Sequence, residues 1–572
     1  MILQALTDYY DRLASDPYSG IAPMGWEYKE IPFVIVLRKD GTLVNLEDTR
    51  EKPEGSKFKV AHRYLAPKSE KRTHTKAQIL WDNVEYITGH DCKGHPDQTE
   101  EYHKAFMQRL EEFADCPSIT PIITFLKRPS FVEELSQFPA WKEAVDGCAF
   151  MTFRILGESD PVFCAPEVQK RIDALTAKAP SENASQGLCL VTGERDVIAR
   201  LHPVIQGVRG ANGTGGNLVS FQEAAFRSYG NKQGDIAQIG EKAAFKYTTA
   251  LNRLLGRDSK QKMVVGDTTI VAWADGECSL ENEFASAFDE PSKDNPDALV
   301  NSVNELLTSV EKGVFTHNED NMRFFVLGLA PNAARLAVRF WHHGTVAEME
   351  MRFAKWFKDL QIDHAPYEKE HLSLWRLMLS LAPQGKTENI PPKLAGDIMR
   401  SVITGTPYPT AMLSYALMRN KAEQDVTYPR AKLIKAYLTQ NKKKELKMGL
   451  DKTNTNPGYA LGRLFATLEK LQSEAINNPN ATIRDRFYGA ASTTPVTVFP
   501  RLINLAMHHL SKANRGVFFD RLITEILDVA DFREGFPATF SNDDQSMFAL
   551  GYFLQRGAFF KGKDATQDKA SN

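Results

Sequence analysis

The sequence of 572 residues has almost no net charge and no long apolar run, with 70 Lys and Arg against 72 Asp and Glu. No stretch approaches the roughly 18 to 20 apolar residues of a membrane-spanning helix. The first 17 residues, MILQALTDYYDRLASDP, follow the pattern of an acidic amphipathic helix rather than that of a signal peptide. We therefore expect a cytoplasmic globular protein with no membrane partner.

Cysteine is also scarce, with six residues spread through the first half of the chain and no CxxC pair. This spacing excludes a zinc ribbon and is typical of reduced thiols in a cytosolic protein. One group, His90, Cys92 and His95 in GHDCKGHPD, has the residue types of a metal site. No second pair of ligands follows at a recognisable distance, so a polar loop is the favoured interpretation and no metal is expected.

Catalytic motifs are missing as well. The chain has no HExxH, no GxSxG, no Walker pair and no His, Cys and Asp set in a usable local context. We therefore predict no catalytic residue and no cofactor. A metal-dependent nuclease that uses His90, His95 and nearby acids remains an alternative.

The pattern of apolar residues predicts an α+β protein. A hairpin is expected at Ile31–Leu46 around the Asp40-Gly41 turn, with further strands from Phe150, Gly187 and Thr268. Between them, helical periodicity covers Gln98–Phe113 and Pro166–Ala177. We thus expect a mixed α/β N-terminal region followed by an all-α helical bundle, divided at 1–150, 151–330, 331–447 and 448–572.

After about Gly276, long amphipathic helices replace the strand patterns. Ser541 and Asp544 lie three residues apart at the start of the last of these helices, as in a capping box. The tail from Lys561 is polar and is expected to be disordered. The predicted helices are Asp297–Gly313, Asn332–Trp341, Val346–Leu360, Lys369–Leu381, Pro392–Thr404, Pro409–Ala422, Ala431–Thr439, Pro457–Ile476, Val498–Ala513, Arg515–Phe532 and Asn542–Arg556.

Against this near-neutral background, one segment is strongly basic. The segment 56–76, SKFKVAHRYLAPKSEKRTHTK, holds seven Lys and Arg against the single acid Glu70. The apolar and aromatic ILWDNVEYITG follows, so the basic segment is predicted to be a loop or hairpin fixed to a core element. A local cationic surface indicates contact with a polyanion. On charge alone, a solvated surface run fits equally well.

Three further segments could bind phosphate or bases. The segment 205–221 has five glycines with Arg209, Asn212 and Asn217, but lacks the Lys-Ser/Thr of a P-loop. The segment 221–255 interleaves cations with aromatic residues, as single-stranded nucleic acid requires, although aromatics at helical spacing also occur in cores. Arg335 and Arg339 are expected on one face of a helix, where they fit either phosphate or a carboxylate pair.

The chain resembles the large subunit of the type I-C CRISPR surveillance complex, Cascade. The resemblance runs in order from residue 1 to about 560 and rests on a set of motifs that are individually modest. These motifs are MILQALTDYYDRLA, GIAPMGW, KRTHTKAQILWDNVEYITG, VTGE, IARLHPVIQGV, AFRSYGNKQG, KYTTALNRLL, LGLAPNAARLAVRFW and FALGYFLQR.

The resemblance implies a non-catalytic subunit that recognises the protospacer-adjacent motif in double-stranded target DNA and aids duplex opening. The implied partners are the 5′ handle of the guide RNA, the target DNA, the backbone and RNA-processing subunits of Cascade, a small subunit from the same gene, and a helicase-nuclease. In this division of labour, base pairing reads the sequence and the protein reads the adjacent motif and the backbone.

We assign the candidate residues to three roles on this basis. The motif-reading set is Lys68, Lys71, Arg72, Thr73, Thr75, Lys76, Asn212, Asn217, Asn231 and Gln233. The backbone-contacting set is Arg209, Arg227, Lys232, Lys246, Arg335 and Arg339. The set for the non-target strand is Arg484, Arg486, Arg501, Lys512 and Arg515.

The string KKKELKMGL also permits an internal translation start at Met448. Lys444-Glu445 can be encoded as a ribosome-binding sequence placed six nucleotides before the Met448 codon, and the resemblance implies a separate small subunit from the 3′ end of the gene. Residues 448–572 hold 14 Lys and Arg against 13 Asp and Glu, so any strand binding there needs a charged face. A lysine run in a linker is the simpler interpretation without the resemblance. For the whole chain, a scaffold that binds only protein is a further alternative.

Overall fold

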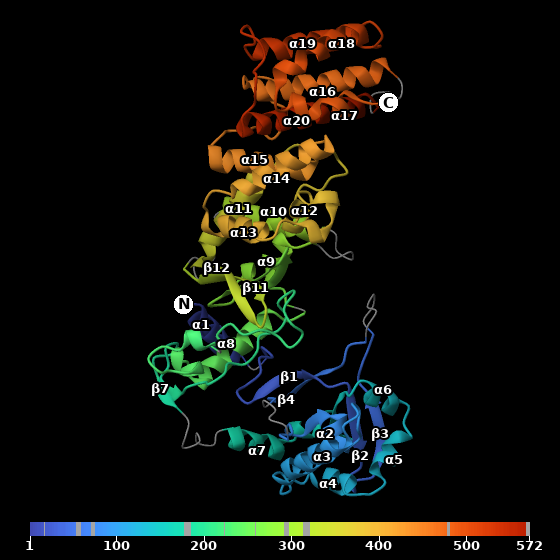
Figure 1. The fold of residues 1–572 in the computed structure, drawn as a ribbon, viewed down its shortest axis with the longest axis vertical. Helices are drawn as coiled ribbons and strands as arrows, with labels where there is room; N and C mark the ends of the chain where they lie inside the picture. The colour runs from blue at the N-terminus through green and yellow to red at the C-terminus, as the bar shows by residue number, and fades with distance from the viewer. Residues whose placement is uncertain are drawn as a thin grey trace. The chain divides into compact units, whose positions relative to one another are not determined.

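The computed structural model of the protein describes residues 1–16, 18–52, 59–69, 75–176, 185–221, 223–257, 259–290, 297–312, 321–476 and 481–567. The chain divides into two compact units built from interleaved segments (Figure 1). The larger unit consists of Met1–Tyr9, His202–Gln222 and Ala250–Asn572, and the smaller unit consists of Tyr10–Leu201 and Glu223–Thr249. The four-part division expected from the sequence stays a prediction.

The smaller unit is built on a four-stranded sheet with the strand order β3-β2-β6-β5. Strand β2 pairs antiparallel with β3 and parallel with β6, and β5 pairs antiparallel with β6. All five residues of β2 are buried, as expected for a strand covered on both faces. The predicted hairpin is confirmed, with Gly41 at φ 81° in its turn. The strands are β2 (Phe33–Leu37), β3 (Leu43–Asp48), β5 (Trp81–Asn83) and β6 (Phe150–Ile155).

Short helices pack around this sheet, and two small antiparallel ribbons complete the unit. The ribbon β1 (Trp26–Glu30) with β4 (Arg63–Pro67) carries the basic segment, because Lys68 directly follows β4. The helices are α2 (Val84–Thr88), α3 (Pro96–Glu111), α4 (Thr120–Leu126), α5 (Phe131–Ser136), α6 (Ala140–Asp146) and α7 (Pro166–Thr176), and the second ribbon is β7 (Gln186–Leu188) with β8 (Arg195–Val197). Helices α1 (Ile2–Ala14) and α8 (Glu241–Leu254) contribute residues to both units.

The larger unit contains an antiparallel sheet with the order β12-β11-β10-β9, followed by helices. One apolar core runs through this unit, from Met263 in β9 to Leu554 near the end of the chain. The strands are β9 (Lys262–Val265), β10 (Thr268–Ala274), β11 (Arg323–Asn332) and β12 (Arg335–Thr345), and the helices before residue 448 are α9 (Ser279–Phe288), α10 (Ala298–Lys312), α11 (Val346–Leu360), α12 (Leu374–Leu379), α13 (Leu394–Thr404), α14 (Thr410–Glu423) and α15 (Tyr428–Lys442). The α+β class predicted from the sequence is confirmed.

The helix predicted at Asn332–Trp341 is wrong. The chain instead turns at Ala333, whose φ is 53°, and returns as β12 along β11. The pairing passes from Leu329–Val338 to Gly328–Phe340, so Arg339 is the inserted residue of a β-bulge. Buried Leu336 and Phe340 therefore lie four residues apart in a strand, which imitates helical spacing in the sequence.

The last helices close the larger unit, and α16 and α20 lie side by side (Figure 1). A Cβ on Gly462 would lie 2.1 Å from the carbonyl oxygen of Phe548, so only glycine permits this approach. The predicted cap at Ser541 is confirmed, because Asp544 N donates to Ser541 Oγ at 3.2 Å. The helices are α16 (Pro457–Ala475), α17 (Ile483–Ala491), α18 (Phe499–Leu510), α19 (Gly516–Val529) and α20 (Asn542–Gln567). Helix α20 thus extends into the tail expected to be disordered.

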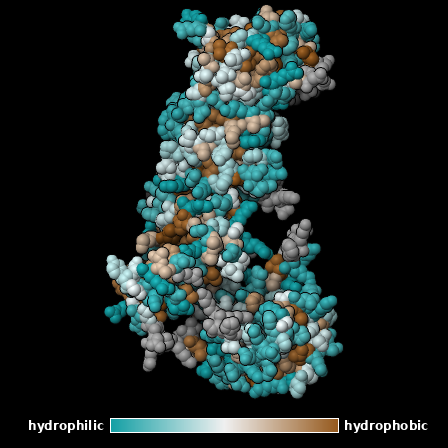
Figure 2. Space-filling view, viewed as in Figure 1, coloured by the Kyte–Doolittle hydropathy of each residue, from teal (hydrophilic) through white to brown (hydrophobic). Residues whose placement is uncertain are grey.

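The surface in view in Figure 2 is mostly hydrophilic, with small scattered apolar patches. Among the described residues, no helix has the length and apolar character needed to cross a membrane.

Candidate nucleic-acid interface

A pocket of about 410 Å³ lies at the foot of the basic segment in the smaller unit. Ser69 and Gln78, which lie on either side of residues 70–74, both line this pocket. The chain returns to the sheet through Leu80, a non-glycine residue at φ 63°. Such strain occurs where the surrounding structure holds a segment in one place. The remaining lining residues are Lys29, Trp81, Asn83, Lys93, Gly147, Cys148 and Phe150.

The pocket combines two ammonium groups with an aromatic floor. Lys29 Nζ lies 4.9 Å from the ring centroid of Trp81 and 4.7 Å from that of Phe150. Trp81 is only 1% exposed and donates its indole N–H to the carbonyl oxygen of Pro67 at 2.9 Å. Because this ring is covered, it positions Lys29 by a cation–π contact rather than offering a stacking face. The ammonium group that the pocket offers to a ligand is therefore that of Lys29, because Lys93 Nζ already lies 3.2 Å from the Glu85 carboxylate.

The predicted motif-reading residues on the basic segment differ in their placement. Lys71, Arg72 and Thr73 lie outside the described residues. Lys68 contacts the protein itself, because its Nζ lies 4.7 Å from the ring centroid of Phe245. Burial lowers the pKa of Lys68, and the nearby carboxylates of Glu27 and Glu241 oppose this shift. Thr75 and Lys76 are exposed.

Residues 223–232 form a second exposed segment of the smaller unit. Tyr229 is fully exposed at φ 52°, and the predicted contacts Arg227, Asn231 and Lys232 beside it are also exposed. The side-chain oxygen of Gln233 already accepts a hydrogen bond from Arg200 at 2.9 Å. An exposed aromatic ring among cations has the composition that binds single-stranded nucleic acid.

Lys246 on α8 forms an ion pair within the protein. Its Nζ lies 2.7 Å from Asp11 Oδ1, so the ammonium already has a carboxylate partner. A phosphate contact by Lys246 would have to compete with this ion pair, and we therefore place it last among the backbone-contacting candidates of the smaller unit.

The glycine-rich segment belongs to the larger unit, and two of its glycines are explained by close backbone approach. A Cβ on Gly207 would lie 2.5 Å from the carbonyl oxygen of Leu255, and one on Gly215 would lie 2.6 Å from that of Ile205. Asn217 also serves the loop, since its Nδ2 donates to the carbonyl oxygen of His202 at 3.1 Å. Arg209 and Asn212 are exposed.

The two arginines expected on a helix face lie on β12. Arg339 pairs with Asp267 at 2.6 Å, which matches the carboxylate alternative of the sequence analysis. Arg335 forms a parallel bridge with Asn217 through the backbone. The bridge joins the glycine-rich segment to the edge of the sheet.

Some of the cations proposed for the non-target strand have carboxylate partners, and others are exposed. Arg484 lies 3.3 Å from Asp425, and Arg515 pairs with Glu474. Arg501 stacks over the ring of Phe487 at 5.5 Å while remaining exposed. Arg486 and Lys512 are exposed.

Among the residues that the structure describes, His90 and His95 do not belong to a group of potential metal ligands, as the nuclease alternative requires. His90 packs edge-on against Trp141 at 5.5 Å, and His95 is the exposed N-cap residue of α3. Cys92 instead lies with Glu85 and Cys148. Cys148 is far from Cys92 in the sequence, so no local motif could show this group.

Sequence reasoning also missed the pocket residues Lys29, Lys93 and Phe150. Their only signal was the aromatic LWDN element after the basic segment, because Lys29 lies on β1 of the ribbon and Phe150 lies on β6, the strand paired with β5. Pairing of β5 with β6 brings Trp81 and Phe150 to an edge-to-face contact of 5.3 Å.

The fold and these surfaces define an α+β protein with a lysine-containing pocket that is lined in part by Ser69 of the basic segment. The family model described as CRISPR-associated protein Cas_Csd1 matches residues 6–560, and the chain therefore belongs to the Cas_Csd1 family. This membership supports the large subunit of a Cascade-type CRISPR complex. The comparison with curated proteins finds no match.

Proposed function

We propose that the chain is the non-catalytic large subunit of a type I-C Cascade, which recognises the protospacer-adjacent motif in double-stranded DNA, aids R-loop formation and recruits a helicase-nuclease. Family membership supports the complex, and the cationic pocket at the foot of the basic segment is the observation that carries the DNA contact. The proposed partners include the guide RNA and the other Cascade subunits.

The size of the pocket indicates that the pocket and the basic segment contact different parts of the DNA. A volume of about 410 Å³ is in the range of small-ligand sites and holds a nucleotide-sized group rather than a duplex. We therefore assign duplex contact to the basic segment, in which Thr75 and Lys76 are exposed. Lys29 would pair with a phosphate, which fixes the register of the protein on the DNA while polar side chains read base edges. Lys93 could join it only by leaving the Glu85 carboxylate, which lies 3.2 Å from its Nζ.

Salt-dependent binding by the assembled complex tests this proposal. Lys29→Ala and the double variant Lys71→Ala/Arg72→Ala should each weaken binding of target duplex and flatten the dependence of log K on log salt by about 0.9 for each phosphate that is no longer neutralised. Lys142→Ala, an exposed lysine on α6 of the same unit, is the matched control. Unchanged affinity of both test variants across salt would refute the proposed DNA interface.

We also propose that residues 448–572 are made separately as the small subunit. Met448 is 49% exposed and lies between α15 and α16, so a product that begins there keeps α16 to α20 whole. In the full chain, Arg484 and Arg556 share Asp425 as a partner at 3.3 and 2.8 Å. The separate product lacks Asp425, so each arginine loses one carboxylate partner, although Arg484 keeps Glu469 and Asp485 at 3.9 and 3.8 Å.

A further inference from the structure

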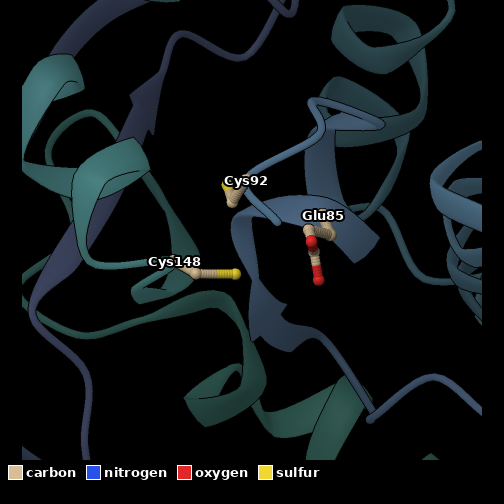
Figure 3. Close-up of side chains that lie close together, drawn as sticks. All are labelled: Glu85, Cys92 and Cys148. Carbon is tan, nitrogen blue, oxygen red and sulfur yellow. The ribbon is translucent and has the colours of Figure 1, made fainter. Parts of the chain in front are cut away.

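Three potential metal ligands converge in the smaller unit, beside the pocket. The side chains of Glu85, Cys92 and Cys148 lie close together (Figure 3). One ligand atom of each lies within 4.8 Å of the other two. Glu85 comes from the first turn of α2, Cys92 from the loop before α3, and Cys148 from the turn after α6. Cys148 also lines the pocket, so the cluster is reached from it.

The backbone holds both cysteines in defined positions. Cys148 is a non-glycine residue at φ 41°, a rare conformation for an L-residue, and its N–H donates to the carbonyl oxygen of Val145 at 2.9 Å. The carboxylate of Asp91 accepts hydrogen bonds from the N–H groups of Lys93 and Gly94 at 2.9 and 2.8 Å. This turn fixes the loop on which Cys92 lies.

The buried carboxylate of the cluster has one exposed lysine as a cationic partner. The Glu85 side chain is 5% exposed, and its carboxylate lies 3.2 Å from Nζ of Lys93, whose side chain is 57% exposed. A buried carboxylate beside two thiols is the environment in which a divalent cation relieves the electrostatic cost, because it stabilises all three anionic ligands together.

We propose that Glu85, Cys92 and Cys148 bind one Zn²⁺, with water as the fourth ligand. Thiolate and carboxylate ligands with one open position are the donor set of a four-coordinate zinc site. Binding converts the two thiols to thiolates and releases their two protons to solvent, leaving a site of net charge −1 beside Lys93. Zinc would tie α2, the loop before α3 and the turn after α6 together as one wall of the pocket. The proposal does not depend on the proposed function.

Cobalt provides the direct test on the full-length wild-type chain. We expect the metal-free, reduced protein to bind one equivalent of Co²⁺ with a thiolate-to-cobalt charge-transfer band, and Zn²⁺ to abolish that band. Zn²⁺, but not Mg²⁺, should also protect Cys92 and Cys148 from alkylation, as read by mass spectrometry. No charge-transfer band and no protection in the wild type would overturn the proposal, whatever the variants do.

Variants identify the ligands. Cys92→Ser and Cys148→Ser should each lose the charge-transfer band, and Glu85→Gln should weaken Co²⁺ binding by roughly tenfold or more. Cys164→Ser, a half-buried cysteine of the same unit outside the cluster, and His95→Ala should keep the wild-type band and affinity. A band that survives in both cluster cysteine variants, or a Cys92–Cys148 disulfide in protein isolated without reductant, would contradict the site.

Discussion

At the scale of single residues, the larger unit buries a lysine inside its helical core. Lys432 is 2% exposed, and its Nζ donates to the carbonyl oxygens of Glu370 at 2.7 Å and Leu360 at 3.3 Å. Burial lowers the pKa of Lys432 from 10.5 to about 7. The folded protein therefore gives up this proton at a pH where the unfolded chain keeps it.

This difference predicts a pH-dependent stability. Between pH 7 and about 10 the unfolded state binds more protons at Lys432 than the folded state, so the unfolding free energy rises with pH, by up to about 1.4 kcal/mol per pH unit. Lys432→Met removes this contribution and should flatten the rise in denaturant unfolding measured from pH 7 to 9. Lys386→Met, at an exposed position, should leave the slope unchanged. Equal slopes in the wild type and Lys432→Met would contradict the prediction.

A second prediction for a single residue concerns base stacking by Tyr229. A fully exposed ring at positive φ gains nothing from packing, whereas stacking on a base is worth about 1–3 kcal/mol. We expect Tyr229→Ala to weaken binding of nucleic acid by the assembled complex by an amount in that range. Tyr367→Ala, at a residue that is 86% exposed in the larger unit, is the control. If both variants bind equally well, Tyr229 has no role in stacking.

At the scale of elements, the contact between α16 and α20 depends on glycine. A Cβ on Gly551 would lie 2.2 Å from the carbonyl oxygen of Tyr459, so the helices must separate to accept one. We expect Gly551→Ala to lower the unfolding free energy by about 2–3 kcal/mol, the cost of overpacking a core. Thermal unfolding measures the change.

Gly557→Ala on the same helix is the matched control for this contact. No atom lies within 4 Å of a Cβ built there, so the better helix propensity of alanine should stabilise α20 by up to about 1 kcal/mol. A Gly551→Ala protein as stable as Gly557→Ala would show that the close approach is not required.

The same scale shows why helix prediction succeeded at Val346–Leu360 and failed at Asn332–Trp341. Thr345 and Glu348 form a complete capping box before the first segment, which is a local signal. The second segment has apolar residues four apart, but its backbone hydrogen bonds are made to β11. Pairing with a distant strand overrides local periodicity, and no pattern within the segment records that partner.

At the scale of the whole molecule, the internal start at Met448 makes a prediction about the gene product. Expression with only a C-terminal tag should yield a product of residues 448–572 besides the full chain. Translation that starts at Met448 would produce helices α16 to α20 intact, because Met448 lies between α15 and α16. Immunoblotting detects it, and silent recoding of codons 444 and 445 should abolish it. A single band from both the original and the recoded gene would rule the start out.

The sequence by itself determined the α+β class, the Asp40-Gly41 hairpin, most of the later helices and the position of the basic segment. These features depend on periodicity, turn residues, caps and local charge, which are properties of neighbouring residues. The family resemblance was also carried by ordered motifs of the sequence, and the family model confirms it at the level of Cas_Csd1.

Only the tertiary structure decided which cations have a carboxylate partner and which residues meet. It paired Arg339 with Asp267 and Arg515 with Glu474, and it brought Lys29 into the same pocket as Ser69. It also showed that the potential metal ligands near Cys92 are Glu85 and Cys148, and not its sequence neighbours His90 and His95. The physical reason is that ion pairs, pockets and metal ligands form between residues joined by strand pairing and core packing, and these contacts bridge separations in the chain that no local pattern encodes.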